Sequence, residues 1–426
     1  MRSRTERATR ALIVSAVFAA AMMLIRSFVP DAHGQASESR WVTAWGTSQQ
    51  AAGDTPISNA TVRLIARPTI AGDSIRIRFD NAFGREPLEI GRAFAGHRVR
   101  GALLAKGSNR PVMFNGVPNV AIPAGGSVTS DPVALKVLAL QDVAVSLFIA
   151  GTRVMPSQHT GAVVTSYRSP DESGDVAAAE EATAFTLTTT SLWWLKSVEV
   201  QASSRSASVV AFGDSITDGT CSTLDAHDRW EDVVAARLFE RSAANRPVSS
   251  PREDPLAIVN EGIGGNTLTR QGLDPPPDSP PALERIERDV LSHHGVSTVV
   301  LFMGTNDIRR GASADQVIQA MTTVAQKVKA SGARVVGVTI IPRHGADAGG
   351  ATNWDSSKTR IRNAVNGWIR GRAPFDAVID FSRVVNDPAD PDLILPAFNC
   401  GDGIHPSPRG YFEMGSAVDL SVLRKR

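Results

Sequence analysis

The pattern of hydrophobic residues changes near residue 206, and this change limits the folds open to the chain. Before it, period-two alternation occurs in short runs between clusters of Gly, Pro, Asn and Asp: 62–66, 74–79, 143–149 and 184–189. A chain of 426 residues is long for one domain and comfortable for two. We therefore expect a β-rich domain over residues 37–205, sandwich-like or jelly-roll-like, and an α/β domain over residues 206–426.

Strand-like and helix-like segments alternate in the second half. Such alternation predicts a parallel sheet with helices on both of its faces. The loops after Phe212, Asn260 and Met303 then lie side by side, because the strand ends at one edge of an open sheet share a crevice. The expected strands are 208–212, 256–260, 298–303, 334–340 and 376–380, and the expected helices lie near 229–241, 281–291, 314–330, 354–371 and 408–423.

Four short motifs in the second half carry residues that suit nucleophilic catalysis. A serine hydroxyl such as that of Ser215 becomes a strong nucleophile when a base accepts its proton, and His405 is the candidate base. Asp402 lies three residues before His405 and can hold the imidazole in the correct tautomer. The motifs are Gly-Asp-Ser at 213–215, Gly-Gly-Asn-Thr at 264–267, Gly-Thr-Asn-Asp at 304–307 and Asp-Gly-Ile-His-Pro at 402–406.

Together and in this order, these motifs resemble the SGNH/GDSL hydrolase family over about residues 207–426. The resemblance implies a flavodoxin-like three-layer α/β/α domain with Ser215, Asp402 and His405 as catalytic residues. It also implies an oxyanion hole formed by the backbone N–H groups of Ser215 and Gly265 and the side-chain amide of Asn306. The Gly-x-Ser-x-Gly elbow of the α/β-hydrolases is absent around Ser215, which argues against that fold.

The function that follows is an exported serine esterase that hydrolyses carboxylic esters through an acyl-enzyme. Relatives with this architecture are GDSL-type esterases or lipases, so acyl or acetyl esters on a small molecule, a carbohydrate or a lipid are the expected substrates. Two alternatives stay open: an acyltransferase of the same fold, and a non-catalytic polysaccharide-binding protein. The mechanism requires no metal or organic cofactor. The formal charge of +2 does not indicate a nucleic-acid partner, and the oligomeric state stays open.

The N-terminus has the layout of a secretory signal peptide. Four arginines within residues 2–10 precede an apolar run from Ala11 to Ile25, and small and polar residues follow. We expect cleavage of residues 1–36, which lowers the formal charge from +2 to about −1. No later segment is long and apolar enough to span a bilayer. Because an exported protein with two cysteines favours a bond between them, we predict a Cys221–Cys400 disulfide and a secreted or periplasmic location.

Several other residues attract attention. The pair His293 and His294 could suggest a metal site, but no matching cluster of carboxylates and histidines accompanies it, and we expect both to be surface residues at a helix end. The pair Trp193 and Trp194 is expected to pack inside the protein, and Asp307 to order its loop. The family resemblance places Arg229 near the rim of the active site, and a packing role is the alternative for it. His159 reaches the active site only if the β-rich domain covers that site.

Overall fold

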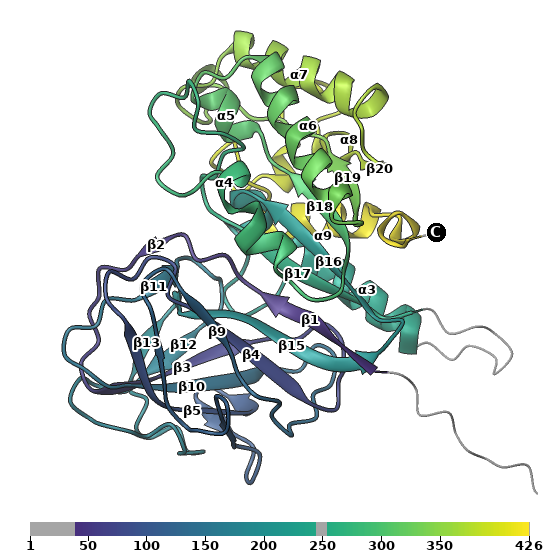
Figure 1. The fold of residues 1–426 in the computed structure, drawn as a ribbon. Coiled ribbons are helices and arrows are strands. Elements are labelled where there is room, and N and C mark those ends of the chain that lie inside the picture. The colour runs from purple at the N-terminus through teal and green to yellow at the C-terminus, as the bar shows by residue number, and fades with distance from the viewer. Residues whose placement is uncertain (1–38, 244–253, 426) are drawn as a thin grey trace, which may run out of the picture. The chain divides into compact units, whose positions relative to one another are not determined.

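The computed structural model describes residues 39–243 and 254–425. Figure 1 shows a strand-rich N-terminal region, coloured purple to teal, and a C-terminal region that carries the helices, coloured green to yellow. The predicted signal peptide lies outside the described residues. Among the described residues, no helix is both long enough and apolar enough to cross a membrane.

The N-terminal region is built from antiparallel strands, as the period-two pattern predicts, and its described part before Ala207 contains no helix. A four-stranded sheet has the order β1 (Ser39–Gly46), β15 (Leu195–Ser203), β4 (Ile75–Asp80) and β9 (Ser127–Thr129). An eight-stranded sheet runs through β13 (Leu187–Thr189), β12 (Ser166–Arg168), β3 (Ala60–Ala66), β10 (Val143–Ile149), β5 (Leu88–Arg100) and β6 (Leu103–Leu104), with β7 (Arg110–Val112) and β8 (Val120–Ile122) also paired to β5. A three-stranded sheet joins β14 (Leu192–Trp193), β11 (Ser157–His159) and β2 (Ala51–Ala52).

One hydrophobic cluster connects the two larger sheets. Leu64 and Leu147 of the eight-stranded sheet belong to the same cluster as Ile77 and Val198 of the four-stranded sheet. Trp193 and Trp194 are part of it and are buried, so the expectation that this pair packs inside the protein is confirmed. The alternation of apolar residues thus places one face of each sheet in a shared core.

The C-terminal region contains a five-stranded parallel sheet. The strand order is β17 (Leu256–Gly262), β16 (Ala207–Gly213), β18 (Val296–Phe302), β19 (Arg334–Val338) and β20 (Ala377–Ile379). Val210 pairs with Val259 on one side and with Val299 on the other, so β16 lies inside the sheet and its end lies between two other strand ends. Because the chain direction is shared, the loops after these strands meet at one edge.

Alternate residues of β16 enter two different hydrophobic clusters, because successive side chains of a strand point to opposite faces. Val210 and Phe212 pack with α4 (Ala282–Ile286), α6 (Ala314–Ala330) and α7 (Ser356–Gly371). Val209 and Ala211 pack with α3 (Trp230–Ala243), α8 (Phe381–Val385) and α9 (Pro408–Ala417). Shorter helical segments are α2 (Ser215–Asp218), α5 (Thr305–Arg309), the π-helical turn η1 (Glu287–Leu291) and the 3-10 turns η2 (Ala346–Ala348), η3 (Pro396–Phe398) and η4 (Leu420–Leu423).

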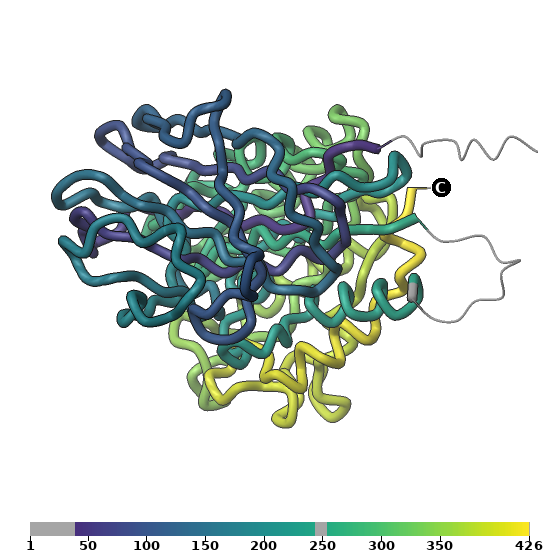
Figure 2. Tube along the Cα trace, turned by 90° about the horizontal axis from the view of Figure 1, so that it is seen from below, coloured from purple at the N-terminus to yellow at the C-terminus, as the bar shows by residue number. Residues whose placement is uncertain are grey.

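The strand-rich region is joined to the parallel sheet by direct hydrogen bonds. The hydroxyl of Ser208 donates to the carbonyl of Thr43 at 2.7 Å, and the N–H of Thr43 donates to the carbonyl of His294 at 3.0 Å. Farther along, the N–H of Ile258 donates to the hydroxyl of Thr69 at 2.8 Å. Figure 1 shows the two regions next to each other, and Figure 2 views the chain with the strand-rich region in front. The first strand, β1, therefore supports the sheet that carries the serine.

Candidate active site

Ser215 is the first residue of α2, directly after strand β16. Asp214 caps this short helix by accepting a hydrogen bond from the N–H of Ile216 at 3.1 Å. Position 213, directly before Asp214, requires glycine, because a Cβ atom there would lie only 2.1 Å from the side chain of Thr217. Ser215 is 8 % exposed. The strand, the glycine and the cap together place the serine hydroxyl at the edge of the sheet.

His405 and Asp402 reach Ser215 from the loop before α9. The Nε2 atom of His405 lies 2.9 Å from Ser215 Oγ, and its Nδ1 atom lies 2.5 Å from Asp402 Oδ2. The other oxygen of Asp402 accepts the N–H groups of Ile404 and His405 at 2.8 and 2.9 Å. Burial alone would raise the pKa of Asp402, but these hydrogen bonds hold it well below its usual range. The geometry brings together the three residues that the sequence singled out.

Asn306 and Gly265 lie beside this group. One hydrogen of the Asn306 amide is donated to the carbonyl of Asn266 at 3.1 Å, and the amide nitrogen carries a second one. The N–H of Gly264 is donated to Asp218 at 2.8 Å, whereas that of Gly265 has no partner within residues 39–243 and 254–425. Gly265 has a φ of +70°, a conformation that glycine adopts without strain. The N–H of Gly265 is therefore free to donate to another group, whereas that of Gly264 is engaged.

These residues open into a cavity of about 400 Å³. It lies at the ends of β16, β17, β18 and β19, where the sequence places the loops of the parallel sheet. Its lining comprises Ser215, Thr220, Gly264, Gly265, Asn306, Arg309, Arg343, Ala351, Thr352, Ile404 and His405. The cavity is large enough to admit a small ester or one end of a longer one.

Cys221 and Cys400 form a disulfide, as predicted. The bond ties the loop after Ser215 to the loop before Asp402, and the N–H of Cys400 also donates to the carbonyl of His405 at 3.1 Å. In the described ranges, one group of potential metal ligands is close enough to share an ion: Cys221, Cys400 and Asp402. Its two sulfur atoms are bonded to each other and its carboxylate is bonded to His405, so these atoms are already engaged.

Two further carboxyl groups are buried next to the site. Burial raises the pKa of Asp214 to about 6, although the hydrogen bond from Ile216 acts in the opposite direction. Burial likewise raises the pKa of Asp307 to about 7. Hydrogen bonds from the N–H groups of Leu268 and Thr269, at 3.0 and 3.3 Å, lower this pKa but do not cancel the effect of burial. Asp307 thereby holds the loop after Asn266, in agreement with the expectation that it orders its loop.

A buried ionic cluster, formed by Lys196, Glu261, Arg285 and Asp289, lies beneath the catalytic loops. Lys196 of β15 donates to Glu261 at 2.8 Å and to Asp289 at 3.0 Å. All four side chains are fully buried, where an unpaired charge is very costly. Burial alone would raise the pKa of Asp289, but Lys196 and Arg288 hold it well below its usual range. The cluster therefore connects the strand-rich region to the catalytic region through charges that have partners.

Arg285 connects this cluster to two catalytic motifs, a role that the sequence did not indicate. It donates to the carbonyl of Gly213 at 2.9 Å, two residues before the serine, and to the side chain of Asn266 at 3.0 Å. It also donates to the hydroxyl of Ser48, at 2.8 Å, in the strand-rich region. Arg285 lies within the predicted helix at 281–291, and the helical pattern contains no signal that separates a buried arginine from an exposed one.

Of the two histidines predicted to lie at the surface, His294 is exposed, as expected, and His293 is not. His293 is buried and its Nε2 lies 2.6 Å from Glu261, so the interpretation of this residue as a surface histidine is wrong. Glu261 belongs to β17, and Gly46 of β1 in the strand-rich region lies close to the imidazole, a contact that sequence alone does not reveal. His159 of β11 lies between the carbonyl of Ser48, at 2.8 Å, and Asp218, at 3.0 Å. Through Asp218 it supports the Gly264 turn without lining the active-site cavity.

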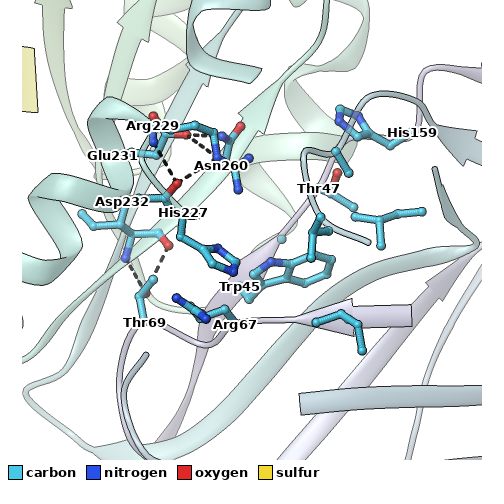
Figure 3. A pocket seen from close by; sticks show the side chains of 16 residues that line it. Trp45, Thr47, Arg67, Thr69, His159, His227, Arg229, Glu231, Asp232 and Asn260 are labelled. Carbon is cyan, nitrogen blue, oxygen red and sulfur yellow. Dashed lines mark hydrogen bonds and ion pairs between the residues drawn. The ribbon is translucent and has the colours of Figure 1, made fainter. Parts of the chain in front are cut away.

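Arg229 lines a different and much smaller cavity, of about 40 Å³, between the strand-rich region and α3 (Figure 3). Its guanidinium lies 2.9 Å from Asp232 and 3.6 Å from Glu231, and Glu231 also accepts a hydrogen bond from Asn260. Burial raises the pKa of Glu231 well above its usual range. Because Ser215 is not among the lining residues, the structure places Arg229 away from the proposed substrate cavity.

Comparisons with known proteins agree with the motifs. Residues 211–411 match the GDSL-like lipase/acylhydrolase family. Among solved structures, a carbohydrate acetylesterase of Sinorhizobium meliloti, Est24, matches at 18 % identity, over 51 % of this chain and all of its own, with a TM-score of 0.39. A putative lipolytic protein of the G-D-S-L family from Desulfitobacterium hafniense matches at 19 % identity, over 51 % of this chain and 99 % of its own, with a TM-score of 0.37. No curated protein matches the chain.

The family match confirms the resemblance that the four motifs carry. The chain contains a GDSL-like lipase/acylhydrolase domain, preceded by a β-rich region. The protein is a carboxylic ester hydrolase.

Proposed function

We propose that this protein is an exported serine esterase in which Ser215 attacks the ester and an acyl-enzyme forms. The observation that carries the proposal is the continuous series of contacts from Ser215 to His405 and from His405 to Asp402, at 2.9 and 2.5 Å. A nucleophile, a base and a group that orients the base are the elements that this chemistry requires. They face a cavity that a substrate can enter.

The reaction runs in two displacements. Nε2 of His405 accepts the proton of Ser215 as Oγ bonds to the ester carbonyl carbon. The tetrahedral intermediate then collapses, the bond to the alcohol breaks, and His405 returns the proton to the departing oxygen. Water then enters and attacks the acyl carbon while His405 accepts one of its protons. The bond between the acyl carbon and Oγ breaks, His405 returns the proton to Ser215 Oγ, and the acid leaves. Asp402 stabilises the imidazolium at each transfer.

The negative charge on the carbonyl oxygen is stabilised by the oxyanion hole. The donors are the N–H groups of Ser215 and Gly265 and the second amide hydrogen of Asn306. Each such donor contributes about 2.7–4 kcal/mol to the transition state at comparable sites. Gly264 and Asp218 hold the glycine turn, and Asp307 holds the next part of the same loop. The donors are therefore in place before the substrate arrives.

Export and domain organisation form part of the proposal. The signal-peptide pattern of residues 1–36 and the disulfide support a secreted or periplasmic location. The strand order and the two hydrophobic clusters support a flavodoxin-like three-layer hydrolase domain over residues 206–426. Residues 37–205 then form a sandwich-like accessory domain. The substrate is an acyl or acetyl ester, carried by a small molecule or a polymer, and no cofactor or nucleic acid takes part.

The direct test is Ser215→Ala, assayed with 4-nitrophenyl acetate. We expect ester hydrolysis to fall to background, because the covalent step is lost, while the thermal unfolding midpoint changes little. Ser222→Ala is the control, since this hydroxyl lies in the same loop and donates to the carbonyl of Gly219 instead. Turnover of pure Ser215→Ala within tenfold of the native enzyme would disprove the serine mechanism.

A further inference from the structure

Two arginines in the lining of the active-site cavity have no acidic partner among the residues that the structure describes. Arg309 and Arg343 both line the cavity that contains Ser215. Within the ranges 39–243 and 254–425, neither guanidinium takes part in a hydrogen bond or an ion pair with the protein. The Nε atoms of both are inaccessible to solvent and unpartnered. These charges therefore differ from the paired arginines elsewhere in the domain.

Arg343 is the more buried of the two, at 5 % exposure. It follows β19, and its guanidinium lies over the ring of Trp354 at 5.4 Å from the ring centroid. This contact with an aromatic ring fixes the arginine without neutralising it. Burial lowers the pKa of Arg343 to about 10, and Arg309 acts in the same direction. The group nevertheless remains cationic at neutral pH.

Arg309 approaches the cavity from α5, three residues after Asn306. Residues three apart in a helix lie on the same face, so the cation and the oxyanion donor are presented together. Burial also lowers the pKa of Arg309, and the next residue, Arg310, adds to this effect. Arg310, by contrast, is occupied by the carbonyl groups of Pro275 and Pro276, at 2.7 and 2.6 Å.

The nearby carboxylates do not neutralise the pair. Asp214 and Asp402 attract Arg343, but neither forms an ion pair with it among the described contacts. Asp214 accepts from Ile216, and Asp402 accepts from His405. Both carboxylates thus have other partners. Two partly desolvated cations side by side repel each other, so an anion that enters the cavity would be stabilised by both.

We propose that Arg309 and Arg343 bind an anionic group of the substrate, a carboxylate or a phosphate carried by the acyl or the alcohol part of the ester. The inference rests on the esterase function proposed above and specifies its substrate class. Planar guanidinium groups match both anions, through paired N–H donors. The two arginines come from the β18 and β19 side of Ser215, whereas Gly265 comes from the β17 side. The anion therefore lies on the β19 side of the reacting carbonyl.

The test compares esters that differ in charge. On the acyl side, 4-nitrophenyl hydrogen glutarate is compared with 4-nitrophenyl valerate. On the alcohol side, 4-acetoxybenzoate and 4-acetoxyphenyl phosphate are each compared with 4-acetoxybenzamide. We expect kcat/KM for at least one anionic ester to exceed that of its neutral partner about ten- to hundredfold, the range of a charged hydrogen bond. The preferred pair identifies which side carries the anion and which anion it is.

The arginines are then replaced singly and together by glutamine. We expect the anionic-to-neutral ratio to fall about tenfold or more in Arg309→Gln/Arg343→Gln, with the change mainly in KM. Arg343→Lys should recover part of it, because the charge is kept. Arg360→Gln, an exposed arginine of α7 outside the cavity lining, is the control and should keep the ratio.

Each outcome decides between distinct conclusions. Native enzyme that hydrolyses neutral esters with no preference for any anionic partner overturns this inference alone. Native enzyme that hydrolyses none of the esters overturns the proposed esterase function. A ratio that persists in the double variant, or an equal loss on neutral and anionic esters in Arg343→Gln, shows that the arginines only support the fold. If a glutamine variant does not fold, the native enzyme still tests the inference. Its ratio of kcat/KM for the anionic ester to kcat/KM for the neutral ester should exceed one and should decrease with added salt, and a ratio that salt does not change overturns the inference.

Discussion

Two groups of charged side chains near Ser215 differ in how they are paired. In the buried ionic cluster, every member has an oppositely charged partner within 3.3 Å. In the cavity lining, Arg309 and Arg343 have no such partner among the described residues. The first arrangement joins the strand-rich region to the catalytic loops, and the second is open to the substrate cavity. Paired charges therefore indicate the supporting framework, and unpaired charges indicate the binding surface.

This difference also explains why the strand-rich region belongs to the catalytic unit. Lys196 and Ser48 belong to that region and bind Asp289 and Arg285 of the catalytic region. Arg285 in turn donates hydrogen bonds to Gly213 and Asn266. A catalytic loop displaced by about 1 Å can lose a hundredfold in rate. We therefore expect disruption of the framework to change stability and activity together, whereas changes on the cavity side change activity alone.

The disulfide gives the largest expected effect; it belongs to neither set of charges and tests how far the loops that carry Ser215 and Asp402 depend on a covalent link. It closes 179 residues between Cys221 and Cys400, which the chain-entropy model equates with about 5 kcal/mol of stability. Reduction with a phosphine should lower the free energy of unfolding by up to this amount, which is measured as a lower urea midpoint. It should also depress activity at urea concentrations at which the reduced protein is still folded. Thiol titration of the unreduced, denatured protein checks that the bond was present. Full activity after complete reduction would show that the bond has no catalytic role.

The next effect concerns the framework. Arg285→Met removes one member of the buried ionic cluster and leaves Asp289 with one fewer partner, so the free energy of unfolding should fall by about 3–5 kcal/mol. Activity should fall as well, because Gly213 and Asn266 lose their shared donor. Arg270→Met is the matched control: its pair with Glu284 is exposed, and such pairs contribute about 1 kcal/mol or less. Equal effects of the two substitutions would contradict the comparison.

On the cavity side, Asn306→Ala should lower kcat about a hundred- to a thousandfold through loss of one oxyanion donor. The urea midpoint should change much less than in Arg285→Met, although the bond to Asn266 is also lost. Steady-state kinetics on one activated ester distinguish the roles. A rise in KM at constant kcat would mean that Asn306 binds the substrate in its ground state instead.

The smallest effect is a pH dependence caused by Asp214. Its pKa is raised to about 6 by burial, so the folded protein holds this proton between about pH 4 and 6, where the unfolded chain has lost it. Stability from this group is therefore greatest at low pH and decreases as pH rises to about 6. A shift of about two units corresponds to about 3 kcal/mol.

Asp214→Asn removes this titration and keeps an oxygen that can cap α2. Urea unfolding of both proteins at pH 4, 5, 6 and 7 should show a stability difference that grows in favour of the variant and levels off near neutral pH. Parallel stability curves would show that the carboxyl of Asp214 does not titrate as described.

Much of the active site follows from short stretches of sequence. Ser215 follows a buried strand and a glycine, and Asp402 and His405 share one loop, so local chain geometry already limits their positions. The parallel sheet then brings these loops together, because its strand ends share an edge. The strand ranges predicted after residue 206 agree closely with β16–β20, and the predicted helices correspond to α3, α4 with η1, α6, α7, and α9 with η4. The sequence pattern does not predict the short helices α5 and α8.

Only the tertiary structure decided which charged residues are paired. Arg285 and Ser48 are 237 positions apart, and no local pattern relates them. His293 reads as a surface residue in sequence, yet it is buried against Glu261. Arg343, in turn, has the same sequence appearance as any paired arginine. The physical reason is that strand and helix patterns depend on near neighbours, whereas the environment of a charge depends on which distant segments pack around it.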